Sequence, residues 1–298
     1  MDTSRRRLKD TFARISMRAS VLFINVLGLA IFCGLLVKAG PILARVPLVE
    51  LLFSTSWHPM KGSFGLFPFI VGTAEVTLIA MLISIPLCLL CAIYLTEYVG
   101  RRSREAARFI IDILAGIPSV IYGLFGVLVI VPVVRAIGES MDVQTTGYSL
   151  LAGGLILAIM VIPFIISISL EVLRMVPGED RESALALGAT KWETIKHVVL
   201  RKAYRGLLAS VVLGFARAFG ETMAVLMVVG NVAEVPSSVF DPAYPLPALI
   251  ANNYGEVMSI PLYDSALMTA AFILMSMVAG FSLTAHYALQ RIGLQGHR

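Results

Sequence analysis

Charged residues are scarce in this chain. Asp, Glu, Lys and Arg make up 14% of its 298 residues, whereas a soluble domain carries about 25%. Hydrophobic residues make up 58%, and the mean hydropathy is +0.86. A single soluble core could not bury this much apolar surface. The composition therefore excludes an ordinary soluble globular protein and indicates that much of the chain faces lipid.

Cysteine and catalytic motifs are also nearly missing. The three cysteines, Cys33, Cys88 and Cys91, all lie in apolar runs, and an odd number within lipid gives no disulfide framework. Cys88-x-x-Cys91 lacks the second pair that a tetrahedral zinc site needs. The sequence has neither a phosphate-binding Gly-x-x-x-x-Gly-Lys loop nor a His-Glu-x-x-His motif. We therefore expect no metal, no cofactor and no ATP hydrolysis in this chain itself.

Long apolar runs are what the chain has instead. A membrane helix needs about 20 apolar residues, with a range of about 17–25. Six runs meet this length: residues 21–37, 69–94, 110–134, 150–173, 206–229 and 265–289. The sequence therefore predicts an all-α integral membrane protein with six transmembrane helices.

Basic residues concentrate on one side of the predicted membrane. Most of the 24 Lys and Arg residues fall in the two tails and in the loops that follow the second and fourth runs. The opposite loops hold only Lys38, Arg45, Lys61 and Arg135. Because basic loops stay in the cytoplasm, we expect a multi-pass protein of the cell (inner) membrane with both termini cytoplasmic. Lys38 also interrupts a possible signal-peptidase site, so we expect the first span to be retained.

The two long loops on the less basic side are rich in turn residues. Residues 40–68 include Trp57-His58-Pro59 and a Gly- and Phe-rich stretch, and residues 231–264 hold five prolines. Such loops are either plain connections or surfaces that contact another protein. The sequence leaves both interpretations open.

The longest loop on the basic side, residues 175–205, predicts a helix, a bend and a second helix. An acidic cluster near its start suits a helix N-terminus. Gly188 can take the left-handed conformation that ends a helix. Trp192, Ile195 and Val199 would then share one face of the second helix. The loop is either an ordinary amphipathic segment or an element that fits a groove on a soluble partner.

Two charged residues lie inside the fifth apolar run. Arg217 is deep in the run, where Arg costs roughly 2.5–3.5 kcal/mol on insertion scales. Glu221 follows four residues later, on the same face if the helix continues, so it could pair with Arg217. One interpretation is a structural ion pair. The other is a path for an oxyanion that still carries a proton, such as hydrogen phosphate. The guanidinium would attract the anion, and the carboxylate would accept a hydrogen bond from its O–H group.

The loop at 175–205 resembles a known docking element. Glu182-Ser183-Ala184, then Gly188, then Val198-x-Leu200 are similar to the EAA loop of ABC importer permeases, the socket for the ATP-hydrolysing subunit. Ser183 stands where the family usually has alanine, and Arg201 where it usually has proline. The resemblance implies that Glu182, Ser183, Ala184, Gly188 and Trp192 form an ATPase-coupling loop.

Further motifs narrow the resemblance. The run Ala216-Arg217-Ala218-Phe219-Gly220-Glu221-Thr222-Met223-Ala224-Val225 and the run Ile117-Pro118-Ser119-Val120-Ile121-Tyr122-Gly123 resemble the C-type permease subunits of phosphate-specific ABC importers. The similarity covers about residues 20–290. It implies a type I ABC importer (MetI-like) permease core over residues 69–290. Residues 1–68 would form a tail, the first span and an external loop, and residues 291–298 a cytoplasmic tail.

The resemblance also implies a function and partners. The chain would move inorganic phosphate into the cell, with Arg217 and Glu221 in the substrate path. It would pair with an A-type permease subunit, two ATP-binding subunits that hold ATP and Mg, and an external phosphate-binding protein. Lipid would surround it, and no nucleic acid is expected. Two alternatives stay open: a permease for another oxyanion (sulfate, molybdate or phosphonate) and a scaffold that signals phosphate status.

Overall fold

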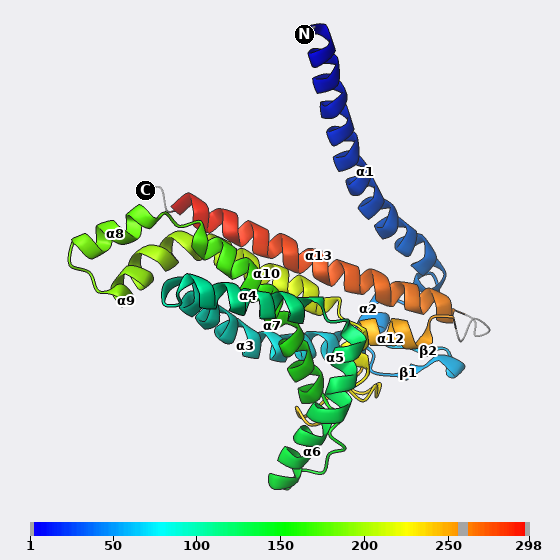
Figure 1. Cartoon of the computed structure of the whole chain (residues 1–298). Helices are drawn as coiled ribbons and strands as arrows, with labels where there is room; N and C mark the ends of the chain where they lie inside the picture. The colour runs from blue at the N-terminus through cyan, green and yellow to red at the C-terminus, as the bar shows by residue number, and fades with distance from the viewer. Residues whose placement is uncertain (1–2, 256–261, 296–298) are drawn as a thin grey trace.

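Helices make up nearly all the regular structure of the computed structural model, which describes residues 3–255 and 262–295 (Figure 1). The helices are α1 (Thr3–Leu43), α2 (Leu48–Phe53), α3 (Phe67–Glu97), α4 (Arg101–Gly116), α5 (Ser119–Phe125), α6 (Val131–Ser140), α7 (Leu150–Arg174), α8 (Gly178–Ala186), α9 (Lys191–Thr194), α10 (Leu200–Phe219), α11 (Met223–Leu226), α12 (Leu246–Asn253) and α13 (Tyr263–Gln295). One two-stranded hairpin joins β1 (Trp57–His58) to β2 (Ser63–Phe64). The predicted all-α fold is confirmed.

Four of the six predicted spans, residues 21–37, 69–94, 150–173 and 265–289, lie within single long helices. Five described segments are long and apolar enough to cross a membrane: Lys9–Leu43, Phe67–Glu97, Ser119–Ser140, Leu150–Arg174 and Tyr263–Tyr287. The remaining predicted span, the fifth along the chain, corresponds to α10, which has 20 residues. Four basic residues lower the hydropathy of α10, although it packs within the same bundle.

The prediction of one helix over residues 110–134 is wrong in its first part. Residues up to Gly116 belong to α4, and the chain turns at Ile117 and Pro118 before α5 begins. Proline disfavours the helical conformation of the residue before it, and Ile117 is extended, with φ −66° and ψ 129°. A short π-helical turn, Gly126–Ile130, then joins α5 to α6. The membrane-length segment therefore starts at Ser119.

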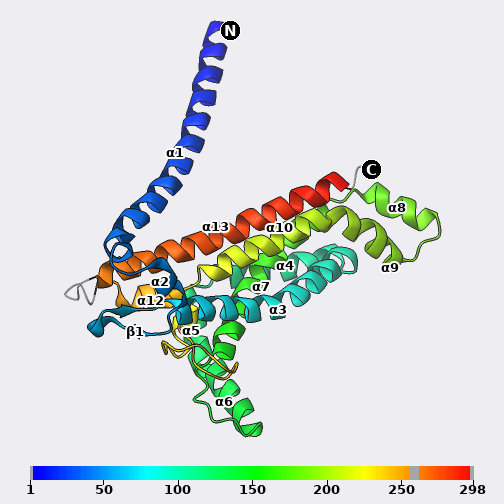
Figure 2. The same ribbon diagram turned by 180° about the vertical axis from the view of Figure 1, so that it is seen from behind.

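The bundle is built around α3 and α7, which lie side by side along most of their length (Figures 1 and 2). Gly154 of α7 lies directly against Ile79 of α3. Farther along α7, Val172 lies against Gly206 of α10. Small residues allow membrane helices to approach closely enough for dense packing. The core of this contact includes Met81, Ile165 and Leu170, all nearly inaccessible to solvent.

The hairpin and α12 close one end of the bundle (Figure 1). The ring centroid of Trp57 lies 5.0 Å from that of Phe69 in α3 and 5.9 Å from that of Tyr263 in α13. Aromatic pairs at these distances add to the stabilisation from burial. Residues 40–68 thus form a packed segment with an exposed tip at Met60, which we call the aromatic cap. Whether this cap contacts another protein stays a prediction.

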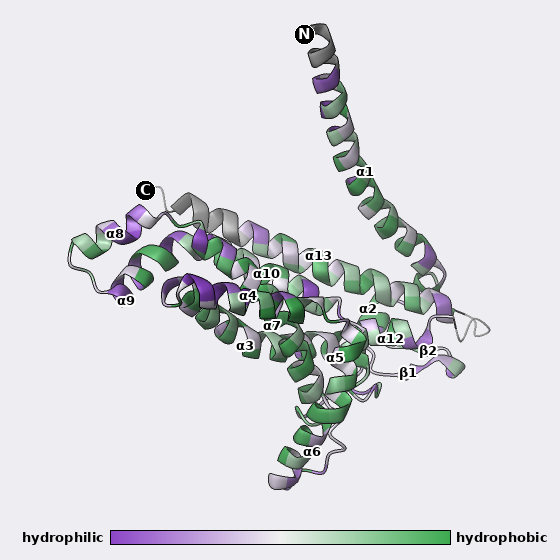
Figure 3. Cartoon of the chain, viewed as in Figure 1, coloured by the Kyte–Doolittle hydropathy of each residue, from purple (hydrophilic) through white to green (hydrophobic). Residues whose placement is uncertain are grey.

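Helix α1 leaves the bundle at an angle (Figures 1 and 2). Its C-terminal part is fastened to α13, because Ser265 Oγ donates to the carbonyl of Lys38 at 3.0 Å and accepts from the backbone N–H of Ile42 at 3.1 Å. Most of the apolar residues earlier in this helix are exposed, and Figure 3 colours much of the helix as hydrophobic. Such a surface is stable only in lipid or against another apolar surface.

The C-terminal helix is longer than expected. The predicted tail over residues 291–298 is helical through Gln295, as part of α13. Its last three residues, 296–298, lie outside the described residues, as do residues 256–261 of the predicted loop at 231–264.

We predict that Gly154→Ala destabilises the fold. The added Cβ would lie 2.8 Å from Cβ of Ile79, and the stiff β-branched side chain cannot move aside easily. Overpacking of this kind lowers the free energy of unfolding by about 1–3 kcal/mol. The measurement is the thermal unfolding midpoint in detergent.

The matched control is Gly280→Ala in α13, where no atom lies within 4 Å of the added Cβ. Alanine favours a helix over glycine by about 0.5–1 kcal/mol, so this variant should be unchanged or slightly more stable. Equal midpoints for the Gly154 variant and the parent chain would contradict the close contact between α3 and α7.

Candidate functional site

The fifth predicted span is interrupted where its charged residues lie. Helix α10 ends at Phe219, Gly220 follows, and the chain makes only the short α11 from Met223. Gly220 has the low helix propensity expected at such an end. Glu221 stabilises the next turn, because its Oε1 accepts a hydrogen bond from the backbone N–H of Ala224 at 3.3 Å. The expected continuous helix over residues 206–229 is therefore wrong beyond Phe219.

Arg217 lies in the last turn of α10, at mid-height in the bundle. One turn earlier, Gly214 contacts Ile165 and Met81, near the middles of α7 and α3. The guanidinium carbon lies 5.1 Å from the ring centroid of Phe164, a cation–π distance. A basic residue at this position is also favoured by the negative end of the α10 dipole.

Arg217 and Glu221 do not form an ion pair with each other, so the structural ion pair, one of the two interpretations of the sequence, is not observed. None of the ion pairs among the described residues includes either side chain. The helix ends between them, so the spacing of four residues no longer places both on one helix face. The two charged groups flank a helix break, and each remains able to bind another molecule.

The surface around Arg217 is open in the single chain. Arg217, Gly220 and Met223 are exposed, and Glu221 is half-buried. A guanidinium without a carboxylate partner is costly in lipid. This surface must therefore face a water-filled path or the polar surface of another protein.

Two other polar groups near this region were not among the predicted site residues. Asn231 has φ 55° and donates from Nδ2 to the carbonyl of Leu226 at 2.8 Å, while its Oδ1 is buried without a hydrogen-bond partner among the described residues. Tyr122 donates to the carbonyl of Leu114 at 2.7 Å. The sequence contained one signal for Asn231, because Gly-Asn often marks a left-handed turn.

The loop at residues 175–205 has the predicted bend. Helix α8 ends at Ala186, and Gly188 has φ 90°, the left-handed conformation that only glycine adopts easily. Thr190 then caps α9: Thr190 Oγ1 accepts from the N–H of Glu193 at 3.3 Å, and Glu193 Oε2 accepts from the N–H of Thr190 at 2.7 Å. Thr-x-x-Glu is the sequence signal for this capping box, although the box was not among the features predicted for the loop.

The capping bonds also act on the carboxylate. The backbone N–H of Thr190, and then its hydroxyl, lower the pKa of Glu193 from its usual value. A lowered pKa means that the cap is present at neutral pH and is lost as the pH falls through the folded-state pKa.

The bend carries an exposed apolar surface. Leu187 is 89% exposed and Trp192 is 54% exposed, while Glu182 and Ser183 are also exposed and Ala184 is half-buried. The predicted shared face is wrong for Trp192, because Ile195 and Val199 are buried and Trp192 is not. Exposed apolar groups on a polar end of a bundle mark an interaction site.

Comparison with known proteins agrees with these features. The family model described as "Binding-protein-dependent transport system inner membrane component" matches residues 84–291. The chain is 36% identical to the "Probable ABC transporter permease protein YqgH" of Bacillus subtilis, covering 96% of this chain and 93% of that protein. It is also 36% identical to the "Phosphate transport system permease protein PstC" of Xylella fastidiosa (strain 9a5c), with 95% and 91% covered.

Solved structures share the fold at lower identity. A bacterial alginate ABC transporter in complex with an alginate-bound periplasmic protein matches with a TM-score of 0.60 and 15% identity, over 95% of this chain and 97% of that chain. An inward-facing MetNI methionine ABC transporter matches with a TM-score of 0.55 and 19% identity, over 76% and 94%. The chain therefore belongs to the family of binding-protein-dependent transport system inner membrane components, and it is an integral membrane permease subunit of an ABC transporter.

Proposed function

We propose that this permease subunit moves inorganic phosphate into the cell, driven by ATP hydrolysis on a partner subunit. The observation that carries the proposal is the exposed guanidinium of Arg217 at mid-height in the bundle, without a carboxylate partner among the described residues. Relatives named as phosphate transport permeases support the choice of substrate.

The helix break suits an anion that still carries a proton. The guanidinium of Arg217 can donate two hydrogen bonds to a tetrahedral oxyanion. The carboxylate of Glu221 would repel a fully ionised anion but can accept a hydrogen bond from the O–H of hydrogen phosphate. Sulfate carries no proton at neutral pH, so the pair favours phosphate over sulfate.

The orientation and the partners follow from the same surfaces. Hydrophilic residues gather at α8, α9 and the start of α4 (Figure 3). We call this end of the bundle the basic end, because the basic loops of the sequence lie there. We assign this end and both termini to the cytoplasm of the cell (inner) membrane. The exposed surface of the bend there would dock one of the two ATP-binding subunits, which hold ATP and Mg. The aromatic cap would face an external phosphate-binding protein.

A second permease subunit would complete the path. Arg217, Gly220 and Met223 are exposed in this chain, and a charged group at this depth requires a polar neighbour. An A-type subunit placed over this surface as a heterodimer partner would enclose Arg217 in a shared path.

We predict that Arg217→Ala lowers ATP-driven phosphate uptake at least about tenfold. A hydrogen bond to a charged group contributes about 1.5–3 kcal/mol, and 1.4 kcal/mol corresponds to a factor of ten. Arg217→Lys should lose most of the same uptake, because lysine lacks the planar pair of donors. Glu221→Gln should let sulfate compete with phosphate. The measurement is labelled phosphate uptake by the complete complex in proteoliposomes.

The control is Arg135→Ala, which removes an exposed arginine paired with Glu139 on the same helix. Such a pair contributes little, so uptake should be normal. Normal uptake and unchanged sulfate exclusion in all three site variants, at normal protein level, would overturn the proposal.

We also predict that Leu187→Asp releases the ATP-binding subunits. Burying a leucine side chain contributes about 1.5–3 kcal/mol, so binding should weaken about ten- to hundredfold. The measurement is the amount of ATP-binding subunit that copurifies with the permease. Met60→Asp, at the tip of the aromatic cap and 88% exposed, should leave copurification intact; an equal yield with both variants would rule out docking at the bend.

A further inference from the structure

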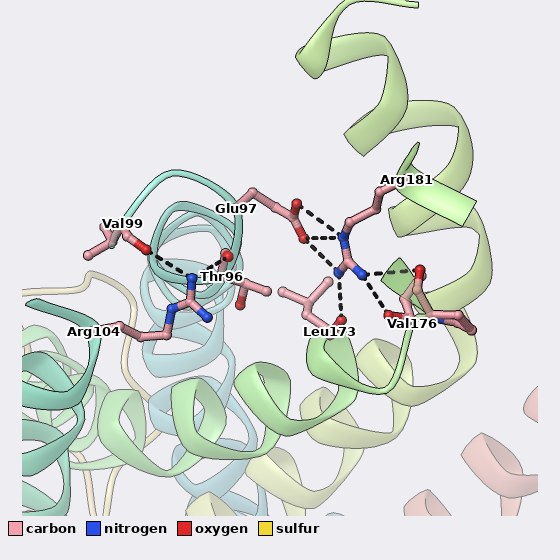
Figure 4. Close-up of polar contacts among 8 residues, drawn as sticks. Thr96, Glu97, Val99, Arg104, Leu173, Val176 and Arg181 are labelled. Atoms are coloured by element: carbon pink, nitrogen blue, oxygen red, sulfur yellow. Dashed lines mark hydrogen bonds and ion pairs between the residues drawn. The ribbon is translucent and has the colours of Figure 1, made fainter. Parts of the chain in front are cut away.

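Arg181, in the first half of α8, joins three structural elements (Figure 4). Its Nε and Nη2 donate to the Glu97 carboxylate at the end of α3, at 2.8–3.3 Å. Nη2 also donates to the carbonyl of Leu173 at 3.0 Å, and Nη1 donates to the carbonyl of Val176 at 2.6 Å. A longer bond of 3.4 Å from Nη1 to the carbonyl of Pro177 completes the set. Every N–H of the guanidinium thus has an acceptor, and we call this group the Arg181 clamp.

The clamp lies where negative charge accumulates. Helices α3 and α7 both end here, so their carbonyl ends and negative dipole ends point to the same place. The Glu97 carboxylate adds a full negative charge, and its side chain is only 8% exposed. Among the described residues, Arg181 is the only cation in an ion pair with Glu97. One guanidinium therefore pairs with the buried carboxylate at the end of α3 and satisfies backbone carbonyls at and just beyond the end of α7.

Other contacts between the loop and the bundle are weaker. Lys202 Nζ of α10 lies 2.5 Å from Asp180 Oδ2, and Lys191 Nζ lies 4.5 Å from the ring centroid of Tyr98. Both lysines are exposed, and exposed pairs contribute little to stability. The clamp is therefore the main polar connection from α8 to the central helix pair.

A second arginine supports the end of α3 without involving the loop. Arg104 of α4 donates to the carbonyls of Thr96 and Val99 at 2.9 and 2.8 Å (Figure 4). It bonds backbone carbonyls at the end of α3, whereas the clamp bonds the side chain of Glu97 there. Arg104 therefore offers a matched comparison, because its loss affects the end of α3 but leaves α8 attached.

We propose that Arg181 is a positioning residue that transmits movement of α8 to α3 and α7, and so couples ATP hydrolysis on a docked subunit to substrate movement. This inference rests on the proposed function, in which the bend binds that subunit. Arg181 lies on α8, a helix of nine residues, and Leu187 of the exposed bend surface comes directly after the end of this helix. A push on that surface reaches α3 and α7 through the clamp, since α3 and α7 are the pair on which the bundle is built.

The test measures ATP hydrolysis and phosphate uptake on the same reconstituted complexes. Arg181→Gln should retain ATP hydrolysis, while phosphate moved per ATP falls about tenfold, within the range of coupling between sites. Arg104→Gln and Arg101→Gln should keep the parental ratio, because neither arginine contacts α8. A merely structural role would reduce hydrolysis and uptake together and leave their ratio unchanged.

Two further variants cover a failure of Arg181→Gln to assemble. Arg181→Lys keeps a positive charge beside Glu97 but cannot also satisfy the carbonyls of Leu173 and Val176, so the ratio should fall between those of the parent and the glutamine variant. Arg181→Glu combined with Glu97→Arg restores the ion pair and should recover part of the ratio. An assembled complex that carries Arg181→Gln or Arg181→Lys alone and keeps the parental ratio would overturn the inference.

A second measurement needs no phosphate and separates the two proposals. Spin labels at exposed positions 87 of α3 and 283 of α13, in a cysteine-free background, report the distance between these helices with and without ATP. The parent and Arg104→Gln should show an ATP-dependent change that Arg181→Gln lacks. A parent complex that moves no phosphate would contradict the proposed function alone, whereas an equal ATP-dependent change in Arg181→Gln would contradict the role of the clamp.

Discussion

The close packing of α3 against α7 sets the position of the functional groups in this chain. Gly154 allows Ile79 to approach the α7 backbone, and Gly206 and Gly214 let α10 join the pair. In lipid there is no hydrophobic effect between helices, so dense contact between small residues must supply the stabilisation. This packing places the end of α10 at mid-height and brings the carbonyl ends of α3 and α7 together at the basic end.

The break after Phe219 turns two charges into a candidate site. In a continuous helix, Arg217 and Glu221 would neutralise each other across one turn. Because α10 ends between them, Glu221 caps α11 and Arg217 lies against Phe164. A substrate anion can then supply the partner that Arg217 lacks. The cost of leaving a guanidinium in the membrane is consistent with a group kept for binding rather than for stability.

The basic end combines a binding surface with a rigid attachment. Leu187 and Trp192 are exposed at the bend, while Arg181, earlier in the same loop, is bonded to Glu97 and to the carbonyl of Leu173 at the end of α7. A flexible loop could bind a partner but would absorb its movement. Transmission of that movement to the bundle requires a buried, fully bonded contact, because exposed ion pairs contribute too little free energy to hold the segments together.

The sequence by itself determined the membrane class, the helical fold and the bend at Gly188, because lipid requires long apolar helices and glycine alone adopts the left-handed turn easily. It also located Arg217 and Glu221. Only the tertiary structure decided that the helices stop before Pro118 and after Phe219, since membrane helices often tolerate proline and glycine. Likewise, the exposure of Trp192 depends on how α9 packs. The contact of Arg181 with Glu97 joins residues 84 positions apart, and no local pattern encodes a contact that forms only when α3 and α7 bring their ends together.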